Sequence, residues 1–171
     1  MKNRIKTTLA LAMAGLLFAG CRTQDTEPRV EGNYVYEHAF NYDMEGNHCD
    51  VHETGTMDFY ADSSALDSAR QVYTVTFADG DTATIVFNYI SPSRWHLDGK
   101  DFHFAGINDR FRMEVVQGEK GLDFAQKIID TYSGSIDHET TFHLDTLTAD
   151  RLQWSLTYRD GHSDTWEFFR Q

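Results

Sequence analysis

The feature that most constrains the fold of this 171-residue chain is a period-two alternation of apolar and polar residues. In the segment 152–158, LQWSLTY, every second residue is apolar or aromatic. Successive side chains of a β-strand point to opposite faces of a sheet, so such a segment buries one face and exposes the other. Comparable runs, separated by turn sequences such as Asp-Gly, occupy residues 34–40, 51–59, 73–77, 83–89 and 111–115. The pattern predicts an all-β chain of antiparallel strands joined by short connections.

One segment departs from this alternation. Within residues 123–133 the apolar side chains recur at helical spacing, Asp123 and Gln126 suit a capping box, and Gly134 can end the helix. The helical positions are Ala125, Ile128, Ile129 and Tyr132. We expect about seven strands before this helix and about three after it, in an antiparallel up-and-down barrel of about 8–10 strands, because closure removes exposed strand edges.

The turns also predict how neighbouring strands pair. A one-residue change of register reverses the facing of a whole strand, so the apolar residues of two paired strands must share a face. At two of the Asp-Gly turns this requirement predicts a three-residue loop or a bulge beside the glycine. The expected pairs are Val75 with Ile85 in the first hairpin and Trp154 with Phe168 in the second.

Residues 1–20 have the composition of a secretion signal. Three basic residues precede an apolar run from Leu9 to Phe18, and small residues follow it. The run is about ten residues, whereas a transmembrane helix needs roughly 20. We therefore interpret residues 1–20 as a signal peptide that lies outside the folded domain.

The sequence LFAGC at residues 17–21 resembles the lipobox of bacterial lipoproteins. In that family the signal is cut before the cysteine, which then carries acyl chains such as palmitate. The resemblance implies lipidation of Cys21, a tether over residues 21–31 and a barrel domain over residues 32–171. Because Arg22 rather than an aspartate follows the cysteine, we expect attachment to the outer membrane of a bacterial envelope, on its periplasmic or its surface face.

The net charge and the cysteine content limit the kinds of partner that we expect this protein to bind. The formal net charge is −12, and loss of the three basic residues of the signal takes it to −15. Nucleic acids and anionic lipid headgroups need clustered Lys and Arg, so we expect neither as a partner, and the acyl chains on Cys21 make the membrane contact. With Cys21 lipidated, Cys49 has no intramolecular partner and is buried, reactive or joined to another chain.

Four segments together look like the lipocalin-like lipoproteins of bacterial envelopes. They are GNYVYE at 32–37, GTMDFYADSSA at 55–65, RWHLDGKDFHF at 94–104 and the ending FHLDTLTADRLQWSLTYRDGHSDTWEFFR at 142–170. The resemblance implies a small barrel with an interior cavity for an apolar ligand. One departure is that the expected helix precedes the last three strands, whereas in the better-known lipocalins it follows the eighth strand.

The stretch HCDVHE at residues 48–53 is the one most suggestive of a metal site. In a strand, His48, Asp50 and His52 share one face, and residues two apart are separated by about 6.6 Å, so at most two neighbours can share an ion. A structural zinc site needs about four ligands. We interpret the stretch as a polar strand face beside a half-buried Cys49, with a metal site as the less favoured alternative.

The pair His96 and His103 is a second weak candidate for metal binding. A tight loop at Gly99 pairs Trp95 with Phe104 and places the two histidines opposite each other, about 4.5 to 5.5 Å apart at Cβ. Two imidazoles so placed can share Zn²⁺ or Cu²⁺. With the aromatic residues on the core side, we interpret the histidines as an exposed pair, and we predict no cofactor.

The sequence lacks the common catalytic signatures. The sequence contains no G-x-S-x-G, H-E-x-x-H, glycine-rich phosphate loop or C-x-x-C. We assign no catalytic residue and do not expect an enzyme.

The aromatic residues carry the functional prediction. Twelve Phe, eight Tyr and three Trp must largely fill the barrel interior, or line a cavity within it. The candidate ligand-binding residues are Tyr34, Tyr36, Phe87, Trp95, Trp154 and Trp166. The expected function is that of a lipid-anchored, non-catalytic binder of a small apolar or amphipathic ligand. The alternative is a solid barrel that serves as an interaction or assembly module for another envelope protein.

Overall fold

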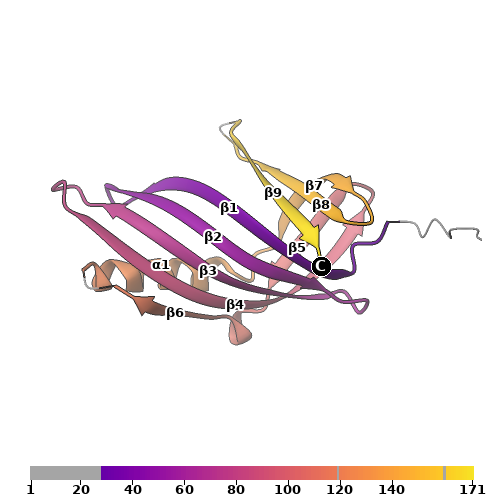
Figure 1. The fold of residues 1–171 in the computed structure, drawn as a ribbon, viewed down its shortest axis with the longest axis horizontal. Helices are drawn as coiled ribbons and strands as arrows, with labels where there is room; N and C mark the ends of the chain where they lie inside the picture. The colour runs from indigo at the N-terminus through magenta and orange to yellow at the C-terminus, as the bar shows by residue number, and fades with distance from the viewer. Residues whose placement is uncertain (1–27, 119, 160) are drawn as a thin grey trace, which may run out of the picture.

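The computed structural model describes residues 28–118, 120–159 and 161–171, which form an all-β antiparallel barrel with one α-helix (Figure 1). This part of the chain contains nine strands, six before the helix and three after it. They are β1 (Gly32–Met44), β2 (Asn47–Phe59), β3 (Ser64–Thr76), β4 (Thr82–Asp98), β5 (Asp101–Gly106), β6 (Arg112–Gln117), β7 (Thr140–Leu147), β8 (Arg151–Thr157) and β9 (Ser163–Arg170), with helix α1 at Leu122–Ser135 and a single 3₁₀ turn at Asn108–Arg110. The predicted fold class is confirmed.

Eight strands close the barrel in the order β1-β2-β3-β4-β5-β7-β8-β9, with β9 pairing back to β1. Strand β6 stands outside this ring. It pairs with the Val86–Ile90 part of β4, while β5 pairs with the Ser93–Asp98 part of the same strand. The long strand β4 therefore pairs with two neighbours in succession, and the chain that follows β6 forms helix α1 before it enters β7.

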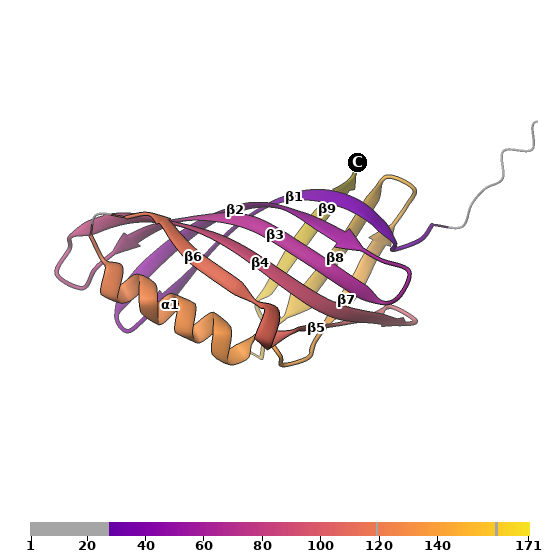
Figure 2. The ribbon, with the colours of Figure 1, turned by 90° about the horizontal axis from the view of Figure 1, so that it is seen from below.

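The barrel has two unlike halves. The long strands β1 to β4 form a twisted sheet, and the short strands β5, β7, β8 and β9 close it into a ring over only part of its length (Figures 1 and 2). In the other half α1 runs beside β6 and covers the inner face of the sheet (Figure 2). The helix thus replaces the wall that the short strands do not reach.

Each half has its own core. In the ring-closed half, Phe59, Phe102, Trp154 and Phe168 pack ring against ring, with the Trp154 and Phe168 centroids 4.5 Å apart. Under the helix the buried residues are Cys49, Val51, Tyr73, Val75, Ile85, Phe87, Phe124, Ala125 and Ile128. Burial of these apolar and aromatic side chains is the main source of stability for both halves.

In all three predicted hairpins the side chains point to the expected faces, but in two of them the register is wrong. Val75 pairs with Ala83 rather than Ile85, and Trp154 pairs with Trp166 rather than Phe168. Both shifts are of two residues, so every side chain keeps its expected face. The physical reason is a tighter turn, in which the Phe77 amide donates to the Asp81 carbonyl at 2.8 Å. The hairpin at Gly99 is confirmed, with His96 opposite His103 and Trp95 opposite Phe104.

The helix is longer than predicted and begins differently. It extends from Leu122 to Ser135, and Gly134 lies inside it rather than ending it. The residue before its first turn is Gly121, at φ 77°, and no side chain caps the helix there. A Cβ at this position would lie 3.0 Å from the Phe77 ring, so both the backbone conformation and the close packing require glycine. The expected capping box at Asp123 is therefore absent.

Two predictions, the signal peptide and the lipidated cysteine, concern the amino-terminal segment. The proposed signal peptide and Cys21 lie outside the described residues. Within the described residues, no helix has the length and apolar character needed to cross a membrane. Val30, at the end of the expected tether, is buried against the ring-closed core.

Candidate functional site

Polar side chains converge inside the barrel, between the two cores. Tyr36, Glu53, Gln71 and Tyr89 come from β1, β2, β3 and β4, and all occupy inward positions in the alternation of their strands. Glu53 and Gln71 are opposite each other across the β2–β3 pair, and their side chains are almost fully buried. The closed sheet therefore brings together, on one wall, polar groups that are up to 53 residues apart in the sequence.

A glycine makes room for this convergence. Gly55 lies opposite Tyr36 in the β1–β2 pair. A Cβ at Gly55 would lie 2.8 Å from the Tyr36 hydroxyl, which real Cβ atoms do not tolerate. The missing side chain lets the Tyr36 ring lie across β2, so that its hydroxyl reaches both Glu53 and Asp67.

Two tyrosine hydroxyls bridge two carboxyl groups. The Tyr36 hydroxyl lies 2.6 Å from Glu53 Oε1 and 2.8 Å from Asp67 Oδ1. The Tyr89 hydroxyl lies 2.8 Å from the same Glu53 oxygen and 2.7 Å from Asp67 Oδ2. Each hydroxyl carries one proton, so the two tyrosines donate to at most two of these four contacts at a time, and a proton on one carboxyl group supplies a third.

Asp67 is the carboxyl group that holds this proton. Its pKa is raised to about 7, chiefly by burial and next by the charge of Glu53, while hydrogen bonds from Tyr89 and Tyr36 oppose the rise. The pKa values of both tyrosines are raised far above their ordinary range, chiefly by burial, so both hydroxyls remain neutral donors. Near neutral pH Asp67 therefore gains or loses its proton.

Helix α1 completes the polar wall through Tyr132. Gln71 donates from Nε2 to Glu53 Oε2 at 2.7 Å and to the Tyr132 hydroxyl at 3.2 Å. Burial raises the pKa of Tyr132 to about 12. The network thus joins four strands and the helix, which fixes the orientation of Glu53.

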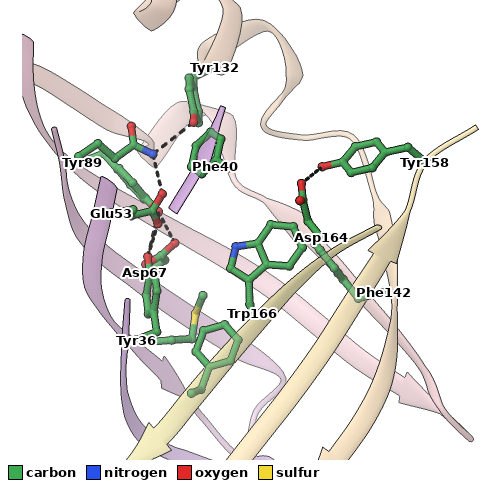
Figure 3. Close-up of a pocket in the computed structure, with 13 residues that line it drawn as sticks. Tyr36, Phe40, Glu53, Asp67, Tyr89, Tyr132, Phe142, Tyr158, Asp164 and Trp166 are labelled. Atoms are coloured by element: carbon green, nitrogen blue, oxygen red, sulfur yellow. Dashed lines mark hydrogen bonds between the residues drawn. The ribbon is translucent and has the colours of Figure 1, made fainter. Parts of the chain in front are cut away.

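A cavity of about 290 Å³ separates this polar wall from strands β7 and β9 (Figure 3). Its opposite wall is aromatic and apolar, and on the far side of Trp166 the Tyr158 hydroxyl donates to Asp164 at 3.0 Å. The lining residues are Tyr36, Phe40, Glu53, Met57, Asp67, Gln71, Tyr89, Tyr132, Phe142, Tyr158, Asp164, Trp166 and Phe168. A polar wall facing an aromatic wall is the arrangement that holds an amphipathic molecule in one orientation.

The cavity is acidic. Three carboxyl groups line it, from Glu53, Asp67 and Asp164, and the described residues that line it include no lysine or arginine. The His162 Nε2 atom lies 3.3 Å from Asp164 Oδ1, on the side of the β8–β9 turn.

His38 adds a buried acceptor to the same interior. It lies between Tyr36 and Phe40 on the inward face of β1, directly opposite Glu53 on β2. Its ring stacks on Trp166 with centroids 4.6 Å apart, and only 9% of the residue is exposed. Burial lowers the pKa of His38, against the charges of Glu53 and Asp164 and a hydrogen bond to the main chain of Thr165. Nε2 has no hydrogen-bond partner among the described residues, so the neutral ring presents an unused acceptor.

The sequence-predicted ligand-binding residues fall into different places. Tyr36 and Trp166 line the cavity. Tyr34 instead donates to the Val30 carbonyl at 3.0 Å, and Phe87 lies in the core beneath the helix. Trp95 donates to the Ser64 carbonyl at 2.9 Å, and Trp154 packs among aromatic rings, with an indole N–H that has no partner among the described residues. A ligand-binding role for these six residues stays a prediction.

Sequence reasoning missed the polar half of the site. Its members are Glu53, Asp67, Gln71 and Tyr89. The available signal was a charged or polar residue at an inward position of an alternating strand, such as Glu53 on the face of Cys49 and Val51. Such a residue is costly to bury without partners, so it marks an interior network.

The histidine candidates for metal binding lie on the outside of the barrel. The His96 and His103 rings stack in parallel with centroids 4.3 Å apart, and His103 Nδ1 lies 3.0 Å from the Thr141 hydroxyl. On β2, His48 Nδ1 lies 2.8 Å from Asp43, and His52 Nε2 lies 2.8 Å from Glu37. Over the described ranges, no three or more His, Cys, Asp or Glu side chains are grouped so as to hold a metal ion.

Comparison of the sequence with protein-family models and with curated proteins finds no match. The eight-stranded closed barrel is consistent with a lipocalin-like fold.

Proposed function

We propose that this protein is a lipid-anchored envelope protein that binds a small amphipathic ligand inside its barrel, without catalysis. The observation that carries the proposal is the 290 Å³ cavity with one polar and one aromatic wall. Water occupies about 30 Å³ per molecule in the liquid, so this volume corresponds to roughly ten waters and suits a ligand of about ten non-hydrogen atoms.

The aromatic wall supplies the apolar contact for such a ligand. Trp166, Phe142 and Phe40 border the cavity and are each only partly buried by protein atoms. A ligand that covers their remaining surface gains about 25 cal/mol for each Å² of apolar area removed from water. The cavity supports this proposal over the alternative of a solid barrel that serves only as an interaction module.

The membrane anchor is the second element of the proposal. It is supported by the lipobox-like sequence that ends at Cys21 and by the short stretch from Cys21 to Val30, where the chain enters the core. We expect wild-type protein expressed in a Gram-negative bacterium to incorporate labelled palmitate and to partition with membranes. The Cys21→Ser variant should do neither, while Cys49→Ser should behave as wild type. Equal labelling of wild type and Cys21→Ser contradicts the anchor.

Ligand binding is tested with the folded domain and three small aromatic probes of similar size: 2-phenylethanol, 2-phenylethylamine and phenylacetate. We expect at least one probe to bind saturably with one site per chain in isothermal titration calorimetry and to change tryptophan fluorescence. The fluorescence response should be lost in Trp166→Phe and kept in Trp95→Phe, since only Trp166 borders the cavity. Absence of saturable binding by all three probes contradicts the proposed function.

A further inference from the structure

We infer that the cavity selects a small organic cation, an ammonium with an aromatic or alkyl body, whose charged group lies against Glu53 and Asp67. This inference rests on the proposed function, because it names the ligand class of the same cavity. It is carried by three features of the interior: acidic groups without a cationic partner, a neighbouring histidine that supplies no positive charge, and an aromatic wall.

The first feature is charge. Glu53 and Asp67 line the cavity together with Asp164, and no lysine or arginine stands among the described residues around it. Buried carboxylates are costly unless a cation or several donors compensate them. Two tyrosines and Gln71 donate to Glu53 and Asp67, but all three donors are neutral. Each ionised carboxylate offers about four acceptor positions, so both groups retain capacity for a further donor.

The second feature is His38. Its Nε2 atom is buried and without a partner among the described residues, and its residue lies directly opposite Glu53 on the neighbouring strand. The ring is held by the stack on Trp166 and by its hydrogen bond to the main chain of Thr165. His38 does not line the cavity, and burial lowers the pKa of its ring, so the neutral imidazole supplies no positive charge to Glu53. An ammonium group, which carries up to three N–H donors and no acceptor, matches a site whose charged groups are carboxylates.

The third feature is the aromatic wall. The rings of Phe40, Phe142 and Trp166 border the remaining cavity, and Figure 3 shows Trp166 between the Glu53 side and the Asp164 side. Aromatic faces attract cations and also bury the apolar body of a ligand. An anionic ligand would instead meet three carboxyl groups. The net charge of −12 further favours the approach of cations over anions.

The discriminating experiment compares 2-phenylethylamine with 2-phenylethanol, which has the same ring and length but no charge. At pH 8 we expect the amine to bind about tenfold or more tightly than the alcohol, since a hydrogen bond to a charged group contributes about 1.5–3 kcal/mol and 1.4 kcal/mol is tenfold. Phenylacetate should bind most weakly. Calorimetric titration gives the three dissociation constants.

Isosteric variants test which residues bind the charged group of the ligand. Asp67→Asn and Glu53→Gln should each weaken amine binding about tenfold or more, while alcohol binding changes by less than about threefold. The matched controls Asp50→Asn and Glu37→Gln alter the outward faces of β2 and β1 and should leave both ligands unaffected.

Wild-type protein supplies a test that needs no variant. Asp67 faces Glu53 from β2, Tyr36 from β1 and Tyr89 from β4, and its proton must leave before it carries charge. Amine affinity should therefore rise as the pH increases from about 6 to about 8, whereas alcohol affinity should stay level.

The outcomes separate the two proposals. Equal binding of amine and alcohol, with no effect of Asp67→Asn or Glu53→Gln, overturns the cation inference and leaves the ligand-binding function intact. Tighter binding of phenylacetate than of the amine overturns the inference in the same way. Failure of all three probes overturns both proposals.

Discussion

The two faces of strand β2 place similar residues in opposite environments. On the outer face His48, Asp50 and His52 are exposed, and the two histidines pair with carboxylates in contact with water. On the inner face Cys49 and Glu53 are buried, and Glu53 receives hydrogen bonds from two tyrosines and Gln71. The six consecutive residues 48–53 therefore contribute both to a row of solvent-exposed ion pairs and to the hydrogen-bond network inside the barrel.

The difference between the two faces is one of solvation. Outside, a hydrogen bond to Asp43 raises the pKa of His48, because the neighbouring carboxylates favour the charged imidazole. Inside, burial raises the pKa of Asp67, because the partly enclosed wall of the cavity solvates a charge less well than bulk water does. An acidic or basic residue type alone does not predict which effect dominates; the face that it occupies does.

The largest expected effect comes from the same inside–outside contrast on β9. Phe168 is 1% exposed and packs on Trp154, whereas its neighbour Phe169 is 49% exposed. We expect Phe168→Ala to reduce the free energy of unfolding by about 3–5 kcal/mol, while Phe169→Ala changes it by about 0.5 kcal/mol or less. Urea denaturation followed by circular dichroism measures both. Comparable losses in the two variants would show that the described facing of β9 is wrong.

The next largest effect concerns Asp67 and pH. The folded state retains the Asp67 proton to a pKa of about 7, whereas the unfolded chain releases it near the ordinary value of 3.8. The folded state binds more protons in this interval, so this group reduces stability as the pH rises from about 4 to about 7, by up to about 4 kcal/mol. Asp67→Asn should therefore become more stable relative to wild type as the pH increases.

Urea titrations at several pH values measure this difference. The matched variant Asp50→Asn, on the exposed face of β2, should keep the wild-type pH dependence. A constant difference between wild type and Asp67→Asn across the range would show that Asp67 does not hold the shared proton.

A smaller effect is expected at Cys49, which is fully buried beneath the helix and has a pKa raised chiefly by burial. Cys49→Ser should lower the free energy of unfolding by about 1–3 kcal/mol, because it places a hydroxyl in an apolar core. The native thiol should react with a disulfide reagent only as fast as the protein opens. Immediate reaction under native conditions would contradict this burial.

The smallest effect is expected on the outer face. The His52 and Glu37 side chains are 2.8 Å apart but largely exposed. His52→Gln should change the free energy of unfolding by about 0.5 kcal/mol or less, in the same urea assay. A loss of more than about 1 kcal/mol would show that the outer array contributes to folding and would weaken the contrast between the two faces.

Much of the fold was predictable because the alternation of apolar and polar residues along a strand shows which of its side chains point inward. The alternation in segments such as 152–158 fixed which side chains point inward, and the hairpin at Gly99 was predicted to the residue. The other two registers were wrong by two residues, since facing does not distinguish registers that differ by an even number. The helix limits were displaced because Gly121 starts it through backbone conformation and packing against Phe77.

The candidate site was only half predictable. Tyr36 and Trp166 were selected as aromatic residues at inward positions, and both line the cavity. Neither Glu53 nor Asp67 was given a role from the sequence. A single strand gives no indication of which residues on the other strands share its height in the barrel.

By itself the sequence determined the strand character, the inward and outward faces and the acidic charge, because these depend on neighbouring residues and on composition. Only the tertiary structure decided that Tyr36, Glu53, Asp67 and Tyr89 meet, and that a cavity separates them from Trp166. Barrel closure and the placement of α1 set these distances, and both depend on pairings between segments far apart in the chain.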